Sequence, residues 1–270
     1  MKKVVLITGA SSGVGRETAI RLSTQGYTVY AVARRIDKMQ DLVPLGIKVT
    51  FMDVTDSDSI NAVVDSVLNA EGRIDILINN AGYGLYGAFE EVSIEEARKQ
   101  LEVNLIGLAS ITQVVIPYMR KQKSGKIINI SSVGGKMVGP FGAWYHVSKF
   151  GVEALSDALR LELKPFGIDV IVIQPGGIRS EWSGIAMNNL KSTAHNSVYA
   201  SAITKVLSSN EELERQYAKP SVIANLIAKA IQSKNPKTRY SGGYMAGFIL
   251  FLRRVVPDRI IDKMILSKIA

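Results

Sequence analysis

Short apolar runs alternate with longer amphipathic stretches along the whole chain. Runs rich in valine and isoleucine are typical of buried strands, and apolar residues recurring at three- and four-residue intervals are typical of helices. The predicted strands are Val4–Ile7, Thr28–Val32, Ile47–Met52, Ile74–Asn79, Lys126–Ser131, Asp169–Gln174 and Thr238–Tyr240. The predicted helices are Arg16–Gln25, Ser57–Ala70, Ile94–Met119, Ala143–Leu163, Glu211–Tyr217 and Ser221–Gln232. This alternation predicts one α/β domain with a doubly wound parallel sheet of about seven strands flanked by helices.

A glycine-rich turn follows the first predicted strand and leads directly into a helical pattern. A helix N-terminus offers unpaired N–H groups and a positive dipole end to phosphate, and glycine allows close approach of the backbone. The spacing is G-x3-G-x-G, which differs from the commoner G-x-G-x2-G fingerprint. We predict that this turn binds a pyrophosphate, and a purely structural turn is the alternative. The residues concerned are Gly9, Ser11, Ser12, Gly13, Val14 and Gly15.

Two arginines follow the second predicted strand. In dinucleotide-binding folds an acidic residue near this position bonds the ribose 2′-hydroxyl, whereas arginine accommodates a 2′-phosphate. Here Ala33 is followed by Arg34 and Arg35, without a carboxylate at the strand end. We therefore predict that NADP(H) is the cofactor. A solvated basic loop is the alternative.

A serine, a tyrosine and a lysine provide the candidate chemistry. Tyr145 and Lys149 are four residues apart, so they share one face if this stretch is helical. A phenol ionises near ~10, and we expect a neighbouring ammonium to lower that pKa. Ser132 directly follows a predicted strand and could hold the substrate oxygen. Side chains alternate along a strand, so only one of Ser131 and Ser132 is expected to face the cleft, and Ser131 is the alternative.

Together these motifs resemble those of the classical short-chain dehydrogenase/reductase family, over nearly the whole chain. Thr8 to Gly15 resembles the family's T-G-x3-G-x-G turn, and the interval from Ser132 to Tyr145 matches the family's spacing. Other matching positions are Asp53 and Val54, Asn79 with Asn80, Ala81 and Gly82, Asn104, and the segment Pro175, Gly176, Gly177, Ile178, Arg179 and Ser180. Ser180 stands where the family usually has threonine.

The resemblance implies a single Rossmann-type domain and roles for these residues. Residues 1–125 would mainly bind the cofactor, 126–180 would carry the catalytic groups, and 181–270 would form a substrate lid and C-terminal segment. Asp53 and Val54 would contact adenine, Asn80, Ala81 and Gly82 the nicotinamide ribose, and Pro175, Gly176, Ile178 and Ser180 the carboxamide region. Asn104, Ser132, Tyr145 and Lys149 would form the catalytic tetrad. Asn104 would anchor a water that links Lys149 to solvent, and a surface asparagine is the alternative.

The implied activity is NADP(H)-dependent interconversion of a carbonyl and an alcohol. Ser132 would orient the carbonyl oxygen, Tyr145 would transfer the proton, and Tyr145 and Lys149 would also contact the cofactor. A loop over Glu181–Asn196 with Trp182 and Met187 suggests a lipophilic substrate, and the C-terminal pattern resembles the steroid- and retinol-active branch. A 3-oxoacyl-thioester reductase and a non-catalytic NADP(H)-binding sensor are the alternatives.

Positive charge is concentrated in the C-terminal segment. From Lys234 onward eight basic and two acidic residues contribute +6 to a formal net charge of +9. The apolar stretch Tyr244–Leu252 lies in this segment and is followed by Arg253 and Arg254. It is too short for a membrane span, which needs about 20 residues. It could wall a substrate pocket or pack a subunit contact, the two alternatives we favour, or meet a membrane peripherally.

The remaining composition narrows the function classes. The chain has no cysteine, which fits a cytoplasmic protein and excludes thiolate chemistry. Its two histidines, His146 and His195, are not expected to form a metal site, and His146 should face outward or line the substrate cleft. No nucleic-acid-binding module accompanies the positive charge. The family resemblance implies a homodimer or homotetramer, paired through the helices that carry Asn104 and Tyr145.

Overall fold

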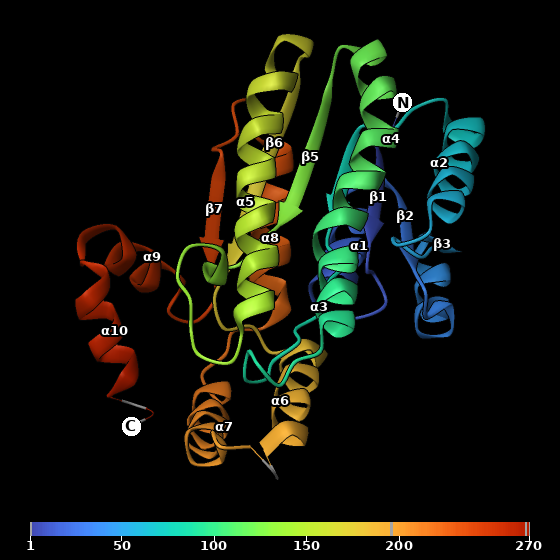
Figure 1. Cartoon of the computed structure of the whole chain (residues 1–270). Helices are drawn as coiled ribbons and strands as arrows, with labels where there is room; N and C mark the ends of the chain where they lie inside the picture. Colours follow the sequence, from blue (N-terminus) through green and yellow to red (C-terminus); the bar gives the residue numbers. More distant parts are fainter. Residues whose placement is uncertain (1, 195–196, 268, 270) are drawn as a thin grey trace.

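A seven-stranded parallel sheet forms the centre of the protein, which confirms the predicted fold class (Figure 1). The computed structural model describes residues 2–194, 197–267 and 269. The strands are β1 (Val4–Thr8), β2 (Thr28–Ala33), β3 (Lys48–Phe51), β4 (Ile76–Asn79), β5 (Gly125–Ile130), β6 (Ile168–Pro175) and β7 (Arg239–Gly242). Their spatial order is β3-β2-β1-β4-β5-β6-β7. The winding reverses between β1 and β4, and doubly wound sheets open a ligand crevice at such a point.

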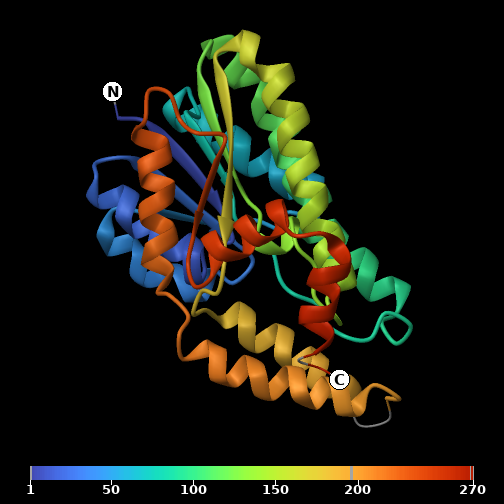
Figure 2. The same cartoon turned by 90° about the vertical axis from the view of Figure 1, so that its left-hand side faces the viewer.

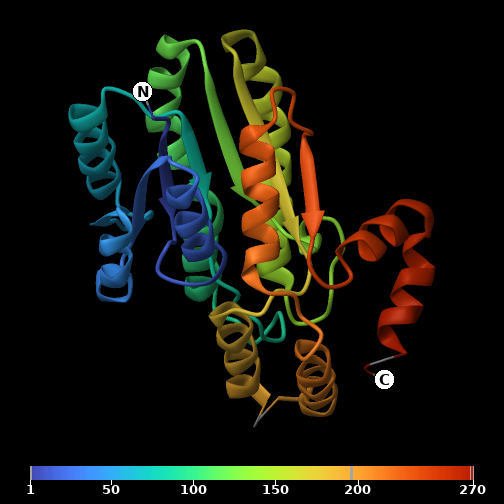
Figure 3. The same cartoon turned by 180° about the vertical axis from the view of Figure 1, so that it is seen from behind.

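Helices cover both faces of the sheet. Figures 1 and 3 show α4 and α5 on one face and α1 and α8 on the other. The α-helices are α1 (Gly13–Thr24), α2 (Ser57–Glu71), α3 (Ile94–Leu101), α4 (Gly107–Gln122), α5 (Ala143–Leu163), α6 (Glu181–Thr193), α7 (Ala200–Glu214), α8 (Pro220–Gln232), α9 (Ala246–Val255) and α10 (Asp258–Leu266). Shorter turns are the 3-10 helices η1 (Ile36–Leu45), η3 (Val133–Gly135) and η4 (Lys164–Phe166), and the π-helix η2 (Glu102–Ile106).

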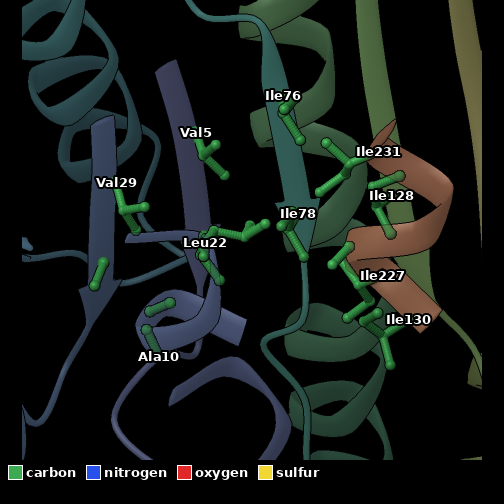
Figure 4. Packing of buried hydrophobic residues seen from close by; sticks show 14 of the residues in the cluster. Val5, Ala10, Leu22, Val29, Ile76, Ile78, Ile128, Ile130, Ile227 and Ile231 are labelled. Carbon is green, nitrogen blue, oxygen red and sulfur yellow. The ribbon is translucent and has the colours of Figure 1, made fainter. Parts of the chain in front are cut away.

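The apolar runs form strands because each strand is buried on both sides. Along β1, Val5 and Ile7 pack into the core under α1 and α8, whereas Val4 and Leu6 pack under α2 and α4. Figure 4 shows Val5, Ile78 and Ile128 of the sheet on the side of Leu22 from α1 and Ile227 from α8. Alternating side chains on a central strand thus enter two separate cores, which accounts for the nearly continuous hydrophobic runs.

Two predicted segments differ from the structure. Glu181–Asn196 was expected to be a loop, but α6 occupies Glu181–Thr193, and Asn196 and His195 lie outside the described residues. The helix predicted at Glu211–Tyr217 is instead α7, which begins at Ala200. Both helices are rich in small polar residues, and Ile203 is the one fully buried residue described in α7. Their apolar stripes are therefore too weak to be recognised from periodicity.

The predicted helix Ile94–Met119 is one continuous helical stretch with a local change of pitch. It comprises α3, η2 and α4, and by length and composition alone Ile94–Gln122 could cross a membrane. In the fold, Leu108, Ile111 and Val115 are buried against the sheet. The stretch therefore serves as a core-facing helix of the α/β domain.

Four helices lie outside the sheet-covering layers. α6 and α7 lie beyond the carboxyl ends of the strands, and α9 and α10 extend from the edge formed by β7 (Figures 1 and 2). These four helices surround the carboxyl ends of the strands, where a doubly wound fold binds its ligands.

Candidate active site

The glycine-rich turn is bonded to the end of β4. Thr8 Oγ1 accepts hydrogen bonds from the backbone N–H groups of Asn80 and Ala81, both at 3.0 Å. The Asn80 side-chain amide donates to the carbonyl oxygens of Thr8 and Gly9, also at 3.0 Å. Gly9 has φ +65°, and a Cβ there would lie 2.7 Å from the Ala81 Cα. Two motifs far apart in sequence are thus held together at the crevice, and glycine is required at their contact.

The N-terminus of α1 presents donors that suit a pyrophosphate. Ser12 is the N-cap residue, and its side chain makes no capping hydrogen bond. The first N–H groups of a helix have no partner within the helix, so those of Gly13, Val14 and Gly15 can serve an anion. A Cβ on Gly13 would lie 3.3 Å from the Cβ of Ser180, which places the end of the Pro175–Ser180 segment beside this turn.

Both predicted arginines lie beside the glycine-rich turn. Arg35 Nη2 donates to the hydroxyl oxygens of Ser11 and Ser12 at 3.1 and 3.2 Å. Its Nη1 lies 3.0 Å from a carboxylate oxygen of Glu181, and Lys38 and Arg35 together lower the pKa of that carboxyl. Arg34 is largely exposed, with Nη1 3.8 Å from Asp53 Oδ2. The end of β2 therefore offers two guanidiniums, the chemistry suited to a phosphate group.

Tyr145, Ser132 and Lys149 meet at the carboxyl ends of β5 and β6. Ser132 Oγ accepts a hydrogen bond from the Gly134 N–H at 3.0 Å and donates to the Pro175 carbonyl oxygen at 3.5 Å. Tyr145 and Lys149 lie in the first two turns of α5, and each is 7% exposed. Lys149 Nζ donates to the Ile130 carbonyl oxygen at 2.9 Å. The expectation that only one of the two serines faces the cleft is wrong, because Ser131 and Ser132 both line the cavity described below. The Ser132 hydroxyl lowers the pKa of Tyr145, whereas the buried Ser131 hydroxyl has no described partner.

The pKa values of this cluster correct one expectation. We expected Lys149 to lower the pKa of Tyr145, but burial raises the pKa of Tyr145 to about 12, and the hydrogen bond with Ser132 opposes this only partly. Burial lowers the pKa of Lys149 to about 8, against an opposing effect of the Glu153 carboxylate. Desolvation disfavours the charged form of both groups and outweighs their partners here. Tyr145 is therefore a protonated phenol at neutral pH.

Asn104 lies in the π-helical turn η2 and is 1% exposed. Its Nδ2 donates to the Tyr83 carbonyl at 2.9 Å and to Ser148 Oγ at 3.2 Å, and its Oδ1 accepts from the Tyr83 N–H at 3.0 Å. A Cβ on Gly82 would lie 3.1 Å from Asn104 Oδ1 and 3.8 Å from Lys149 Nζ. The surface-asparagine alternative is therefore wrong, and the π-turn places the amide between the Gly82 loop and α5.

One cavity joins the predicted site residues. Its volume is ≈ 1360 Å³. Every predicted cofactor or catalytic residue lines it except Gly15 and Asn104, including Asp53, Val54, Pro175, Gly176 and Ile178. Asp53 Oδ1 also accepts hydrogen bonds from the N–H and hydroxyl of Thr55 at 3.0 and 2.8 Å, which fixes the carboxylate at the end of β3.

Aromatic and polar side chains complete the cavity wall around Tyr145. The Trp182 ring centroid lies 4.9 Å and that of Tyr86 5.8 Å from the ring centroid of Tyr145. Farther out, the Tyr217 hydroxyl donates to Asn210 Oδ1 at 3.0 Å. Sequence reasoning missed Tyr86, Tyr217 and Asn210, because isolated residues in a loop or on a polar helix have no distinguishing pattern.

His146 is a buried part of this wall, so the outward-facing alternative is wrong. Its Nδ1 lies 2.9 Å from the Gly134 carbonyl oxygen, and its Nε2 accepts a hydrogen bond from the Gly139 N–H at 2.9 Å. A carbonyl can only accept, so Nδ1 carries the proton. Burial lowers the pKa of His146. The neutral ring therefore holds the 134–139 loop beside Tyr145.

A buried carboxylate lies one turn beyond Lys149 on α5. Glu153 is 3% exposed and is bonded by Arg239 Nε at 2.9 Å, Lys136 Nζ at 3.1 Å and Gln174 Nε2 at 3.0 Å. Arg239 also pairs with Asp157 at 2.7 Å. This network ties α5 to β6 and to β7.

The C-terminal helices form the far end of the cavity. Phe248, Ile249 and Leu252 of α9 and Ile261 and Ile265 of α10 line it. The apolar stretch near the C-terminus therefore walls the pocket, as one of the sequence alternatives proposed. The cavity thus extends from the glycine-rich turn past Tyr145 into a largely apolar region.

Comparisons with known proteins agree with this geometry. A family model described as short chain dehydrogenase matches residues 3–191. The chain is 40% identical over 245 residues to a 3-ketodihydrosphingosine reductase of Bacteroides thetaiotaomicron, covering 89% of this chain and 88% of that protein. A short-chain dehydrogenase structure from Streptomyces avermitilis has a TM-score of 0.80 at 31% identity, covering 99% and 98% of the two chains.

A further structure, actinorhodin polyketide ketoreductase with NADPH, has a TM-score of 0.75 at 30% identity, covering 89% of this chain and 95% of that chain. Other similar structures contain NADP or NAD. The family match covers most of the chain, and the motifs lie where such a fold binds its nucleotide. The protein therefore belongs to the short-chain dehydrogenase/reductase family of oxidoreductases.

Proposed function

We propose that the protein uses NADPH to reduce a ketone on a long-chain, lipophilic substrate. The observation that carries this proposal is that the buried Tyr145 and the half-buried Ser132 line one cavity, which continues between apolar helices. The 40% identical relative is named a 3-ketodihydrosphingosine reductase, which favours a long-chain ketone over a steroid or retinoid. Arg34 and Arg35 at the end of β2 favour the phosphorylated nucleotide.

The residues present fit such a cofactor. Its pyrophosphate would be held by the glycine-rich turn and the N-terminus of α1, its 2′-phosphate by Arg34 and Arg35, and its adenine by Asp53 and Val54. Asn80, Ala81, Gly82 and Lys149 would contact the nicotinamide ribose, with Pro175, Gly176, Ile178 and Ser180 near the carboxamide. When bound, the reduced nicotinamide supplies a hydride.

The chain's own side chains would handle the carbonyl oxygen and the proton. Ser132 would orient that oxygen by a hydrogen bond, and Tyr145 would donate its proton as negative charge develops there. Burial raises the pKa of Tyr145, so the phenol is protonated at neutral pH and has a proton to donate. Asn104 would complete the proton path from Lys149.

We also propose that the protein is a homo-oligomer, paired through α4 and α5. Exposed apolar side chains lie on these helices and on the adjoining η2: Ile106 of η2, Tyr118 of α4, and Val147, Phe150 and Leu161 of α5. Val147, Phe150 and Leu161 recur at helical intervals on α5, so they form one stripe that a second copy could cover.

NADPH oxidation in the presence of long-chain 3-ketones, acetoacetyl thioesters and small aldehydes tests the proposed reaction. We expect turnover with the long-chain ketone. Tyr145→Phe should lower it by about 10²- to 10⁴-fold, the usual contribution of a positioned proton donor. The same variant should bind NADPH nearly as the parent does, since it loses one hydroxyl. Retention of most activity by Tyr145→Phe would refute the assignment, and tight NADPH binding without any turnover would favour a non-catalytic sensor.

A further inference from the structure

The helices α9 and α10 expose an apolar surface in addition to lining the cavity. Phe251 and Val255 of α9 and Ile260 of α10 are 62%, 55% and 51% exposed. Phe251 and Val255 are four residues apart and therefore lie on one side of α9. We call these three residues the α9–α10 face. Figures 1 and 3 show the two helices projecting from the β7 edge, away from α4 and α5.

Cations flank this face. Within the described residues, Arg254, Arg259 and Lys263 have no ion-pair partner, and Asp262 is the opposing exposed charge. Arg253 differs, because it pairs with Asp258 at 2.6 Å and donates to the Lys136 carbonyl at 3.2 Å. That contact anchors α9 to the body of the protein. Exposed apolar side chains with adjacent unpaired cations are complementary to anionic lipid headgroups over acyl chains.

A second copy of the chain would fit the α9–α10 face less well. In a two-fold dimer the same patch meets itself, so the cations of both copies would approach each other. Like charges brought together across an interface oppose association. The stripe on α5 offers a separate apolar surface for pairing. Charge therefore favours a membrane over a second copy at the α9–α10 face.

The same helices connect this surface to the cavity. On their inner side Ile249, Leu252, Ile261 and Ile265 line the cavity that reaches Tyr145. We propose that the α9–α10 face docks on an anionic phospholipid bilayer and that the long-chain substrate enters the cavity from it. The docking stands on the surface itself, whereas substrate entry rests on the function proposed above.

Vesicle binding tests the docking without any need for activity. The full-length protein is mixed with phosphatidylcholine vesicles, with or without phosphatidylglycerol, and the bound fraction is measured by flotation. We expect binding to the anionic vesicles that weakens with added salt. Arg254→Glu with Arg259→Glu should lower the partition coefficient by at least about 25-fold, since each cation near an anionic surface contributes roughly fivefold. Phe251→Ser with Ile260→Ser should lower it by at least about tenfold.

Matched controls are Lys229→Glu on α8 and Val43→Ser on η1, which change exposed residues elsewhere and should bind as the parent does. Parent protein that does not float with anionic vesicles, or a Phe251/Ile260 double variant that binds normally, would overturn the docking. A lower oligomeric state of that double variant in sedimentation without lipid would instead assign the face to a second copy of the chain, which would also overturn the docking.

Activity measurements separate the two proposals. The Phe251/Ile260 double variant should reduce a short, soluble ketone at the parent's rate but lose at least about tenfold in turnover of a long-chain ketone embedded in anionic vesicles. Equal turnover of the embedded ketone by both proteins would overturn entry from the bilayer. Parent protein that binds vesicles but reduces no ketone would leave docking supported and refute the proposed function. Parent protein that reduces ketones without binding vesicles would support the proposed function and refute the docking.

Discussion

Lys149 is an ammonium buried beside the candidate catalytic tyrosine, so its replacement by methionine should change how folding stability depends on pH. Methionine has a similar length and no charge. It therefore keeps much of the packing and removes the free-energy cost of burying the Lys149 ammonium. It also leaves the Ile130 carbonyl, which now accepts a 2.9 Å hydrogen bond from Lys149, without that donor. Removal of the buried charge stabilises the variant and loss of the hydrogen bond destabilises it, but only the first contribution depends on pH.

The pKa of Lys149 sets the size and the window of the effect. Burial lowers it from 10.5 to about 8. Between these values the folded parent binds fewer protons than the unfolded chain, so the parent's free energy of unfolding rises with pH. The buried charge costs about 3 kcal/mol at pH 7, at ~1.4 kcal/mol per unit of pKa, and about 1 kcal/mol at pH 10. The unsatisfied carbonyl costs the variant about 1–3 kcal/mol throughout.

Urea unfolding of both proteins without nucleotide, at pH 7 and pH 10, measures this difference. We expect the Met variant to equal or exceed the parent in stability at pH 7. The parent should then gain about 2 kcal/mol relative to the variant by pH 10. Lys229→Met, which removes an exposed lysine on α8, is the control for loss of one cation. A parent–variant difference that is the same at both pH values would refute the reasoning.

Three further predictions concern the cofactor, the buried network and assembly. Arg34→Ala should weaken NADPH binding by about tenfold or more and NADH binding little, because it removes a charged partner of the 2′-phosphate; fluorescence titration checks this. Glu153→Gln should cost about 1.5–3 kcal/mol in urea unfolding, since it removes a charged partner of Arg239 and Lys136 while Arg239 keeps Asp157, and a loss below about 0.5 kcal/mol would contradict this. Phe150→Glu should lower the oligomeric state in sedimentation, and an unchanged state would exclude the α5 stripe as the subunit interface.

The sheet and the glycine-rich turn were predictable because their causes are local. A strand buried on both faces must be apolar at every position, so runs such as that of β1 stand out. Gly9 is required by its positive φ and its contact with Ala81. The seven strands were predicted within two residues at either end, and the fold class followed from their alternation with helices.

The helices α6 and α7 and the pKa values of the site were not predictable, because they depend on tertiary surroundings. α7 has a single fully buried position, so its sequence lacks the repeating apolar pattern by which a helix is recognised. The pKa of Tyr145 depends on how deeply its ring is enclosed by Trp182 and Tyr86, and helical spacing to Lys149 contains no such information. Asn104 is buried because η2 adopts a π-helical turn, which its neighbours in sequence do not reveal.

The bonds of Glu153 have a consequence for the order in which the protein matures on the ribosome. Arg239 bonds to it from 86 residues later in the chain. During synthesis α5 therefore leaves the exit tunnel well before this guanidinium, and until then Lys136, which precedes α5 in the chain, is the cation bonded to Glu153. The tie between α5 and β7 can therefore form only near the end of translation, after six of the seven strands have been made.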